Sequence, residues 1–159
     1  MKQSIAALVV AVTLFSTNTG ISAETSSVAN HDGLVVIDSA NTMAETEKRL
    51  IAALDASGLK IAARIDHEAN AKSVGLDLAP TVLFIFGNPK AGTVLIEQQR
   101  TVGIDLPFKI LMWDDIGKIK VAYNNPAYIA RRHGLDTSLP VLTQITSTLR
   151  RLAETAASR

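Results

Sequence analysis

The segment FIFGNPKAGT, residues 84–93, decides how the middle of this chain folds. A run of apolar residues leads into Gly-Asn-Pro, and the stretch closes on Gly-Thr. Asn88 is a good helix N-cap, and Pro89 at the first helical turn has no amide to leave unsatisfied. We therefore expect a strand over residues 81–86, covered on both faces as in a buried sheet, and a helix directly after it.

The same glycine loop raises the question of phosphate binding. Gly87 and Gly92 have the separation found in a nucleotide-binding P-loop, but Thr93 stands where that motif has its lysine. The lysine is needed to neutralise the phosphates, so the sequence excludes a P-loop. Structural capping is the favoured interpretation. The alternative is an anion or ligand loop at the helix N-terminus, formed by Gly87, Asn88, Lys90 and Gly92.

Outward from this loop, hydrophobic periodicity and capping residues divide the chain into alternating strands and helices. The residue patterns predict further strands over 34–37, 59–65, 106–113 and 119–123, and helices over 43–57, 66–74, 126–132 and 140–156. The turn at residues 114–118 predicts a β-hairpin, which is the most secure strand pairing. This order predicts an α+β fold: one compact two-layer domain over residues 34–156, with helices packed on a small, largely antiparallel sheet.

The first residues have the pattern of a secretory signal peptide. Lys2 precedes an apolar run over residues 5–15, and Ala23 supplies the small residue expected before cleavage. Such a run is shorter than the ~20 residues of a membrane-spanning helix, and a short membrane anchor is the alternative. We expect a signal peptide over residues 1–23, a flexible tail over 24–33, a periplasmic or secreted location, and no stable membrane insertion after cleavage.

The composition excludes several classes of protein. Without Lys2, the remaining Lys and Arg residues balance the 15 Asp and Glu residues. A near-neutral chain lacks the basic surface that nucleic acids require. The chain contains no cysteine, which excludes disulfides, thiol nucleophiles and covalent c-type haem.

Four blocks of the sequence carry a resemblance to a known family. They are IDHEANAKSVGLDLAPTVLFIFGNP, GNPKAGT, GIDLPFKILMWDD and NNPAYIARRHGL. In this order they resemble the uncharacterised family called domain of unknown function 302, over about residues 35–152. The resemblance implies a compact α+β fold, often as a dimer, and it implies no established activity.

His67 is the main candidate for a metal or haem site. It lies between Asp66 and Glu68, where the second strand gives way to a short helix. A histidine beside carboxylates can be a metal ligand, a haem ligand or a proton acceptor. The favoured alternative is a structural histidine that caps or hydrogen-bonds. His133 is expected to act as a cation at a helix C-terminus.

Other conspicuous side chains are expected to be structural. Met43 and Met112 are interpreted as core residues rather than as thioether ligands. Trp113 and Tyr123 are expected to face each other across the hairpin as a cross-strand pair. None of the common catalytic motifs is present, so no catalytic residue is assigned and an enzyme is the less favoured class.

These observations favour an exported, soluble, non-catalytic domain that binds a ligand or another protein. A homodimer is a further expectation, because the apolar stripe of the last helix, residues 139–152, could cover either the domain's own sheet or a partner. The first alternative function is a redox protein that holds noncovalent b-type haem or a metal through His67, with one haem shared between two chains. The second alternative is an uncharacterised enzyme.

Overall fold

The computed structural model describes residues 28–29 and 33–159. The predicted signal peptide lies outside the described residues. The described strands are β1 (Val28–Ala29), β2 (Leu34–Asp38), β3 (Lys60–Asp66), β4 (Thr81–Gly87), β5 (Phe108–Asp115) and β6 (Lys118–Asn124). The described helices are α1 (Met43–Ala56), α2 (His67–Ser73), α3 (Pro89–Gln98), the 3₁₀ helix η1 (Arg100–Ile104), α4 (Pro126–Arg132) and α5 (Pro140–Ala157).

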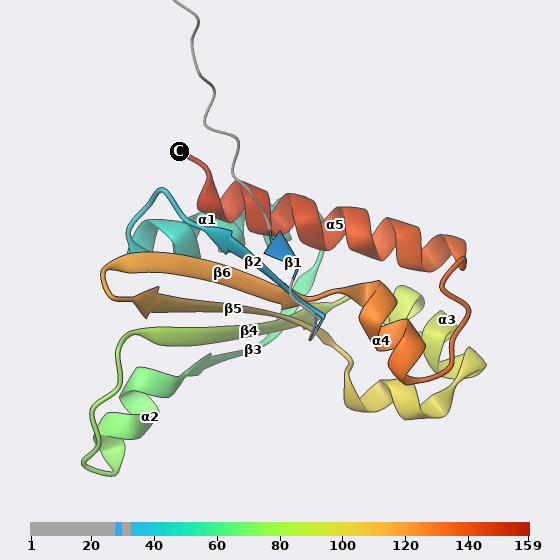
Figure 1. Ribbon diagram of the computed structural model, residues 1–159, viewed down its shortest axis with the longest axis horizontal. Helices are drawn as coiled ribbons and strands as arrows, with labels where there is room; N and C mark the ends of the chain where they lie inside the picture. The colour runs from blue at the N-terminus through green and yellow to red at the C-terminus, as the bar shows by residue number, and fades with distance from the viewer. Residues whose placement is uncertain (1–27, 30–32) are drawn as a thin grey trace, which may run out of the picture.

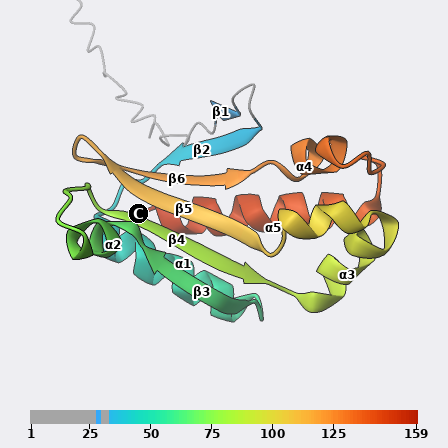
Figure 2. The same ribbon diagram turned by 90° about the horizontal axis from the view of Figure 1, so that it is seen from below.

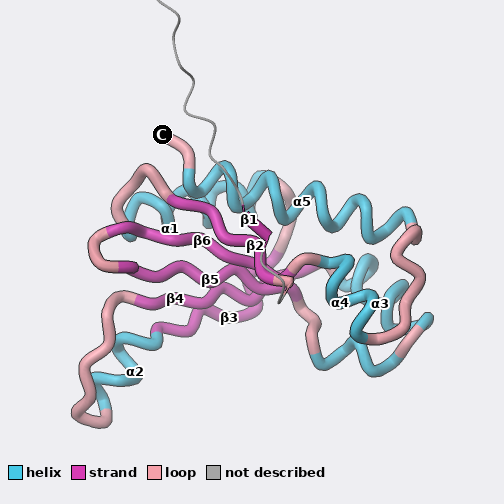
Figure 3. The backbone as a smooth tube through the Cα atoms, viewed as in Figure 1, coloured by secondary structure: helices cyan, strands magenta, loops and turns pink. Residues whose placement is uncertain are grey.

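The strands form one antiparallel sheet in the order β1-β2-β6-β5-β4-β3 (Figures 1 and 3). The predicted α+β architecture is confirmed, and so is the β5–β6 hairpin. Part of the predicted flexible tail differs from the expectation, because Val28 and Ala29 pair with Val36 and Val35 of β2.

Two long helices cover one face of this sheet. Figure 2 looks onto the opposite face, with α1 and α5 lying behind the strands. The two helices pack against each other and against the strands. The predicted apolar stripe of α5 packs against the domain's own sheet. Its buried residues are Leu142, Ile145, Leu149 and Leu152.

The buried strand β4 is covered on one face only, which corrects the expectation of burial on both. Val82, Phe84 and Phe86 are buried beneath the helices, whereas the residues between them are half-buried. Register places Leu83 beside Ile65 and Leu111, and Leu111 beside Ala122. These residues belong to the second face of the sheet, named the open face below, on which Ile65, Leu83 and Leu111 are half-buried and Ala122 is buried.

The expected pairing of Trp113 with Tyr123 was wrong, and β3 contains an irregularity. A β-bulge separates Ile61, which pairs with Phe86, from Ala63, which pairs with Ile85. Ile61 and Ala63 therefore point to opposite faces, because an extra residue reverses the alternation of a strand. Trp113 pairs with Lys120 rather than with Tyr123. Tyr123 points to the helix-covered face and Trp113 to the open face, so the two rings do not meet.

The hairpin tip carries a strained residue. Ile116 and Gly117 form the two-residue loop, with φ angles of 52° and 81°, and Ile116 is 100% exposed. Two-residue loops of this kind require positive φ at both positions and favour Asn-Gly. A β-branched residue in this conformation is an outlier. Ile116 therefore has an unfavourable backbone conformation, and its exposed side chain gains no stabilisation from burial.

We expect Ile116→Asn to raise the free energy of unfolding by about 1 kcal/mol, because asparagine tolerates the left-handed conformation at lower cost. Urea denaturation of the two proteins measures this difference. Ile116→Val retains the β-branch and should show no gain. Equal stability of the Asn variant and the wild type would contradict the assignment of strain.

Candidate functional site

An apolar pocket lies at one end of the sheet. Its volume is about 430 Å³, within the range of ~300–1,000 Å³ that small-molecule sites occupy. It lies where β4 ends and α3 begins, the end at which α3 is labelled in Figure 1. The apolar walls come from β3, β4, β5, α3, α5 and the segment after η1; they include Leu59, Phe86, Ile96, Leu106, Phe108, Ile145 and Leu149.

Three glycines line this pocket, and their backbone does not require glycine. Five of the eight glycines in the described residues have positive φ, which explains why they are glycine. The other three are Gly87, Gly92 and Gly103, and all three line the pocket.

Space does not require these glycines either. A Cβ atom on Gly87 would lie 3.4 Å from Pro107, one on Gly92 3.9 Å from Leu106, and one on Gly103 4.0 Å from Ile96. Each of these neighbours is itself a pocket residue. Side chains at the three positions would therefore project toward the pocket and reduce its volume.

The predicted ligand loop contributes to this pocket only in part. Gly87, Asn88 and Gly92 line it, whereas Lys90 is exposed and does not. The capping prediction is confirmed, because the Asn88 Oδ1 atom accepts a hydrogen bond of 2.9 Å from the Lys90 backbone N–H. The walls from β3, β5 and α5 could not be inferred from the loop itself.

The segment over residues 100–107 forms one wall of the pocket and is fastened by a buried histidine. His133 ends α4, and its side chain is 7% exposed. The His133 Nε2 atom lies 2.6 Å from Asp105 Oδ2, and its Nδ1 atom lies 3.0 Å from Thr101 Oγ1. Arg132 adds an ion pair of 3.3 Å to the same carboxylate. Sequence reasoning placed His133 correctly at a helix end but missed these partners.

Lys109 holds the same segment from the other side. Its Nζ atom donates to the carbonyl oxygens of Asp105 at 2.9 Å and Pro107 at 2.8 Å. Burial lowers the pKa of Lys109, and the nearby Asp105 carboxylate opposes that shift. The pocket wall is thus held between β5 and the end of α4.

The order of these elements and their residues matches one family. The model of the family described as domain of unknown function DUF302 matches residues 35–156. The chain belongs to the DUF302 family. The resemblance noted from the sequence is confirmed.

Curated relatives contain a similar domain within longer proteins. The "Fluoride-specific ion channel FluC 1" of Brucella suis biovar 1 (strain 1330) is 44% identical over 119 residues, which cover 73% of this chain and 47% of that protein. The protein of the same name from Brucella abortus biovar 1 (strain 9-941) is also 44% identical, with 44% of its length covered. This DUF302 chain therefore spans less than half the length of these relatives.

A solved structure supports the fold. The uncharacterised DUF302 protein from Bacillus stearothermophilus superposes with a TM-score of 0.71, covering 78% of this chain and 98% of that chain. The sequence identity is 21%, so the likeness concerns the architecture alone.

The DUF302 fold places His67 away from the pocket. His67 begins α2 beside the start of β4, since Asp66 pairs with Val82, whereas the pocket lies at the other end of that strand. Within the described residues, the His67 side chain makes no hydrogen bond or ion pair.

The two carboxylates that flank His67 have other partners. Asp66 accepts a hydrogen bond of 2.9 Å from the Ala69 N–H and an ion pair from Arg64, and these interactions lower its pKa. Glu68 pairs with Lys72.

Two absences within the described residues bear on the remaining expectations. In residues 28–29 and 33–159 there is no group of three or more His, Asp or Glu side chains that could hold a metal ion. The haem or metal role of His67 stays a prediction. No helix in the same part of the chain has the length and apolar character needed to cross a bilayer.

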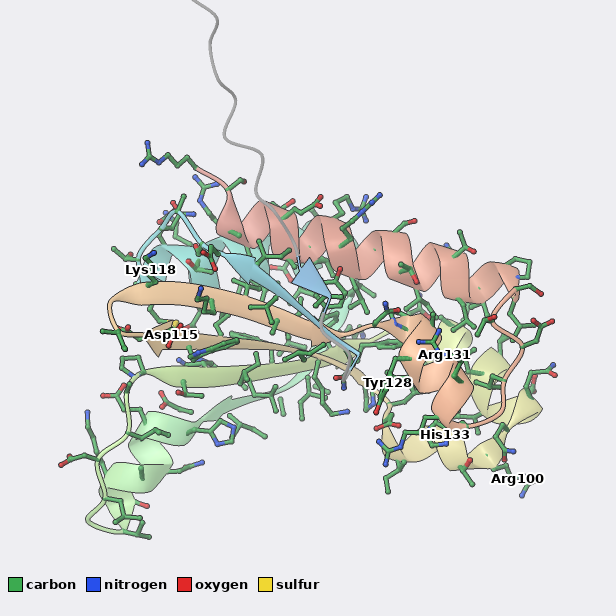
Figure 4. All side chains as sticks on the ribbon, in the orientation of Figure 1. Arg100, Asp115, Lys118, Tyr128, Arg131 and His133 are labelled. Atoms are coloured by element: carbon green, nitrogen blue, oxygen red, sulfur yellow. The ribbon has the colours of Figure 1, made fainter. Side chains whose placement is uncertain are left out.

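We expect His133→Ala to lower the free energy of unfolding by about 1–3 kcal/mol, because it removes a hydrogen bond to a largely buried carboxylate. Chemical denaturation measures this loss. Arg131→Ala is the matched control, since Arg131 lies on the same turn of α4, is exposed, and has a side chain without a partner among the described residues (Figure 4). Equal effects of the two substitutions would contradict a fastening role for His133.

Proposed function

We propose that this DUF302 domain binds a small, mainly apolar ligand in the glycine-lined pocket, without catalysis. The observation that carries the proposal is the set of Gly87, Gly92 and Gly103. They are the described glycines without positive φ, and all three border the same pocket.

Gly92 gives the strongest support. It lies inside α3, where glycine destabilises a helix by about 1 kcal/mol relative to alanine. Neither its φ angle nor a close neighbour requires the absence of a side chain. A need to keep the pocket open would explain why the helix retains this glycine. Natural sites commonly keep residues that lower the stability of the fold.

The composition of the walls indicates the chemistry of the ligand. Most lining residues are aliphatic, aromatic, proline or glycine. Burial of apolar surface contributes roughly 25 cal/mol per Å², so an apolar ligand body gains affinity in this pocket. A general acid or base for catalysis would need an ionisable side chain within hydrogen-bond reach of the substrate, and Lys60 is the one such residue in the lining.

The export predicted from residues 1–23 stays part of this proposal. A ligand-binding domain outside the cytoplasm would meet hydrophobic small molecules directly. Fluoride conduction, named for the Brucella relatives, belongs to whole proteins of which this match spans less than half, and it is not proposed for this chain.

We expect Gly92→Leu to weaken binding of the neutral fluorescent probe N-phenyl-1-naphthylamine at least tenfold and to raise the free energy of unfolding by about 1 kcal/mol. The leucine side chain would fill the pocket while favouring the helix. Fluorescence titration and urea denaturation measure the two effects.

Gly92→Ala serves as the graded control, with a similar gain in stability and a smaller loss of affinity. If one probe binds per chain and its affinity is the same in Gly92→Leu as in the wild type, the binding site lies outside this pocket. The absence of saturable binding to the wild type would refute an apolar pocket function.

We also propose that two copies associate through the open face. Apolar residues from three neighbouring strands lie on it, among them Ile65, Leu83 and Leu111, which are all half-buried. No described helix lies over it in Figure 2. The apolar stripe of α5 is committed to the core, so the proposal places the second copy on this sheet face rather than on α5.

We expect light scattering to give the mass of a dimer for the wild type and of a monomer for Leu83→Gln, because an amide at the centre of the contact would lose water without gaining a partner. Ile116→Asn, at the exposed hairpin tip, should leave the dimer intact. A wild type that is monomeric at all concentrations would contradict this proposal without affecting the pocket.

A further inference from the structure

Lys60 gives the apolar pocket a single charged group. Among the residues that line the pocket, it is the one with an ionisable side chain, and no carboxylate accompanies it. A ligand in this pocket therefore meets one positive charge beside an apolar surface. This inference rests on the ligand-binding function proposed above and concerns the class of ligand.

The Lys60 ammonium has no protein partner in the described part of the chain. Several other basic side chains there are paired: Arg64 with Glu47, Lys72 with Glu68 and Lys120 with Asp38. Lys109, which holds the segment over residues 105–107, uses its ammonium on backbone carbonyls. Lys60 thus keeps its full capacity to bind an anion at the pocket.

Asn88 supplies a second hydrogen-bond donor to the pocket lining. Lys60 pairs with Gly87 across β3 and β4, and Asn88 follows Gly87 directly in the chain. The Asn88 Oδ1 atom is used to cap α3. Its Nδ2 group makes no hydrogen bond within the described residues and is free to donate to the same anion.

We infer that the ligand is an amphipathic monoanion, with its apolar body in the glycine-lined pocket and a carboxylate-type group at Lys60 and Asn88. An ammonium and an amide are both donors, so they suit an acceptor such as a carboxylate. The remaining walls offer mainly carbon atoms, which suit an alkyl or aromatic body.

The test uses three probes of equal chain length: decanoate, 1-decanol and decyltrimethylammonium, each displacing N-phenyl-1-naphthylamine from the full mature chain. We expect the wild type to prefer decanoate over the ammonium probe by about tenfold or more, since hydrogen bonds to charged groups are the stronger ones. Raising the salt concentration should weaken decanoate binding and leave decanol binding unchanged.

Two variants assign the preference to Lys60. Lys60→Met keeps the aliphatic stem and should weaken decanoate about five- to tenfold while changing decanol less than twofold. Lys60→Glu should reverse the order of decanoate and decyltrimethylammonium. Lys118→Met is the matched control, because Lys118 is an exposed lysine at the opposite end of the sheet (Figure 4), and it should change none of the affinities.

The outcomes separate the two proposals. Equal affinities of the three probes for the wild type, with binding still lost in Gly92→Leu, would overturn the anionic preference and leave the pocket function standing. A decanoate preference that survives in both Lys60 variants would also overturn the assignment. Failure of every probe to bind, or binding that Gly92→Leu leaves unchanged, would refute the pocket function itself.

Discussion

The packing of α5 and α1 on one face of the sheet is the interaction on which the rest of this structure depends. Alternate residues of β4 and β5, such as Phe84 and Ile110, are buried beneath these helices. Each large apolar side chain buried in this way stabilises the fold by about 1.5–3 kcal/mol. Because a strand directs successive side chains to opposite faces, this arrangement also determines which residues are left on the open face.

The pocket follows from the same packing. Ile145 and Leu149 of α5 belong to the core and also line the pocket, so one helix closes the core and forms a wall of the site. Beyond the end of β4, α3 continues the helical layer, but its glycine leaves space beside Leu106. The site is therefore a region where the packing is left incomplete next to a well-filled core.

The fastening of residues 100–107 gives the pocket a defined wall. His133 and Arg132 reach Asp105 from α4, and Lys109 reaches the backbone of the same segment from β5. Arg132 and His133 lie 27 and 28 residues from Asp105 in the sequence, whereas Lys109 lies only four residues from it. The model of the family to which the chain belongs describes a domain of unknown function. The pocket combines a wall fixed by these hydrogen bonds, a lining with three glycines, and the unpaired ammonium of Lys60.

The sequence by itself determined the elements, the fold class and the caps of this domain. Apolar periodicity, Asn88-Pro89, Asn125-Pro126 and the turn at Ile116-Gly117 act over a few residues, so their outcome is readable locally. Only the tertiary structure decided which face of β4 was covered, where the bulge reversed Ile61, and which side chains surround Gly92. Those features depend on contacts between residues distant in the chain, whose partners no local pattern specifies. The sequence showed the part of the pocket formed by the glycine loop. It did not show the charged residue Lys60, because only the pairing of β3 with β4 brings Lys60 beside Gly87.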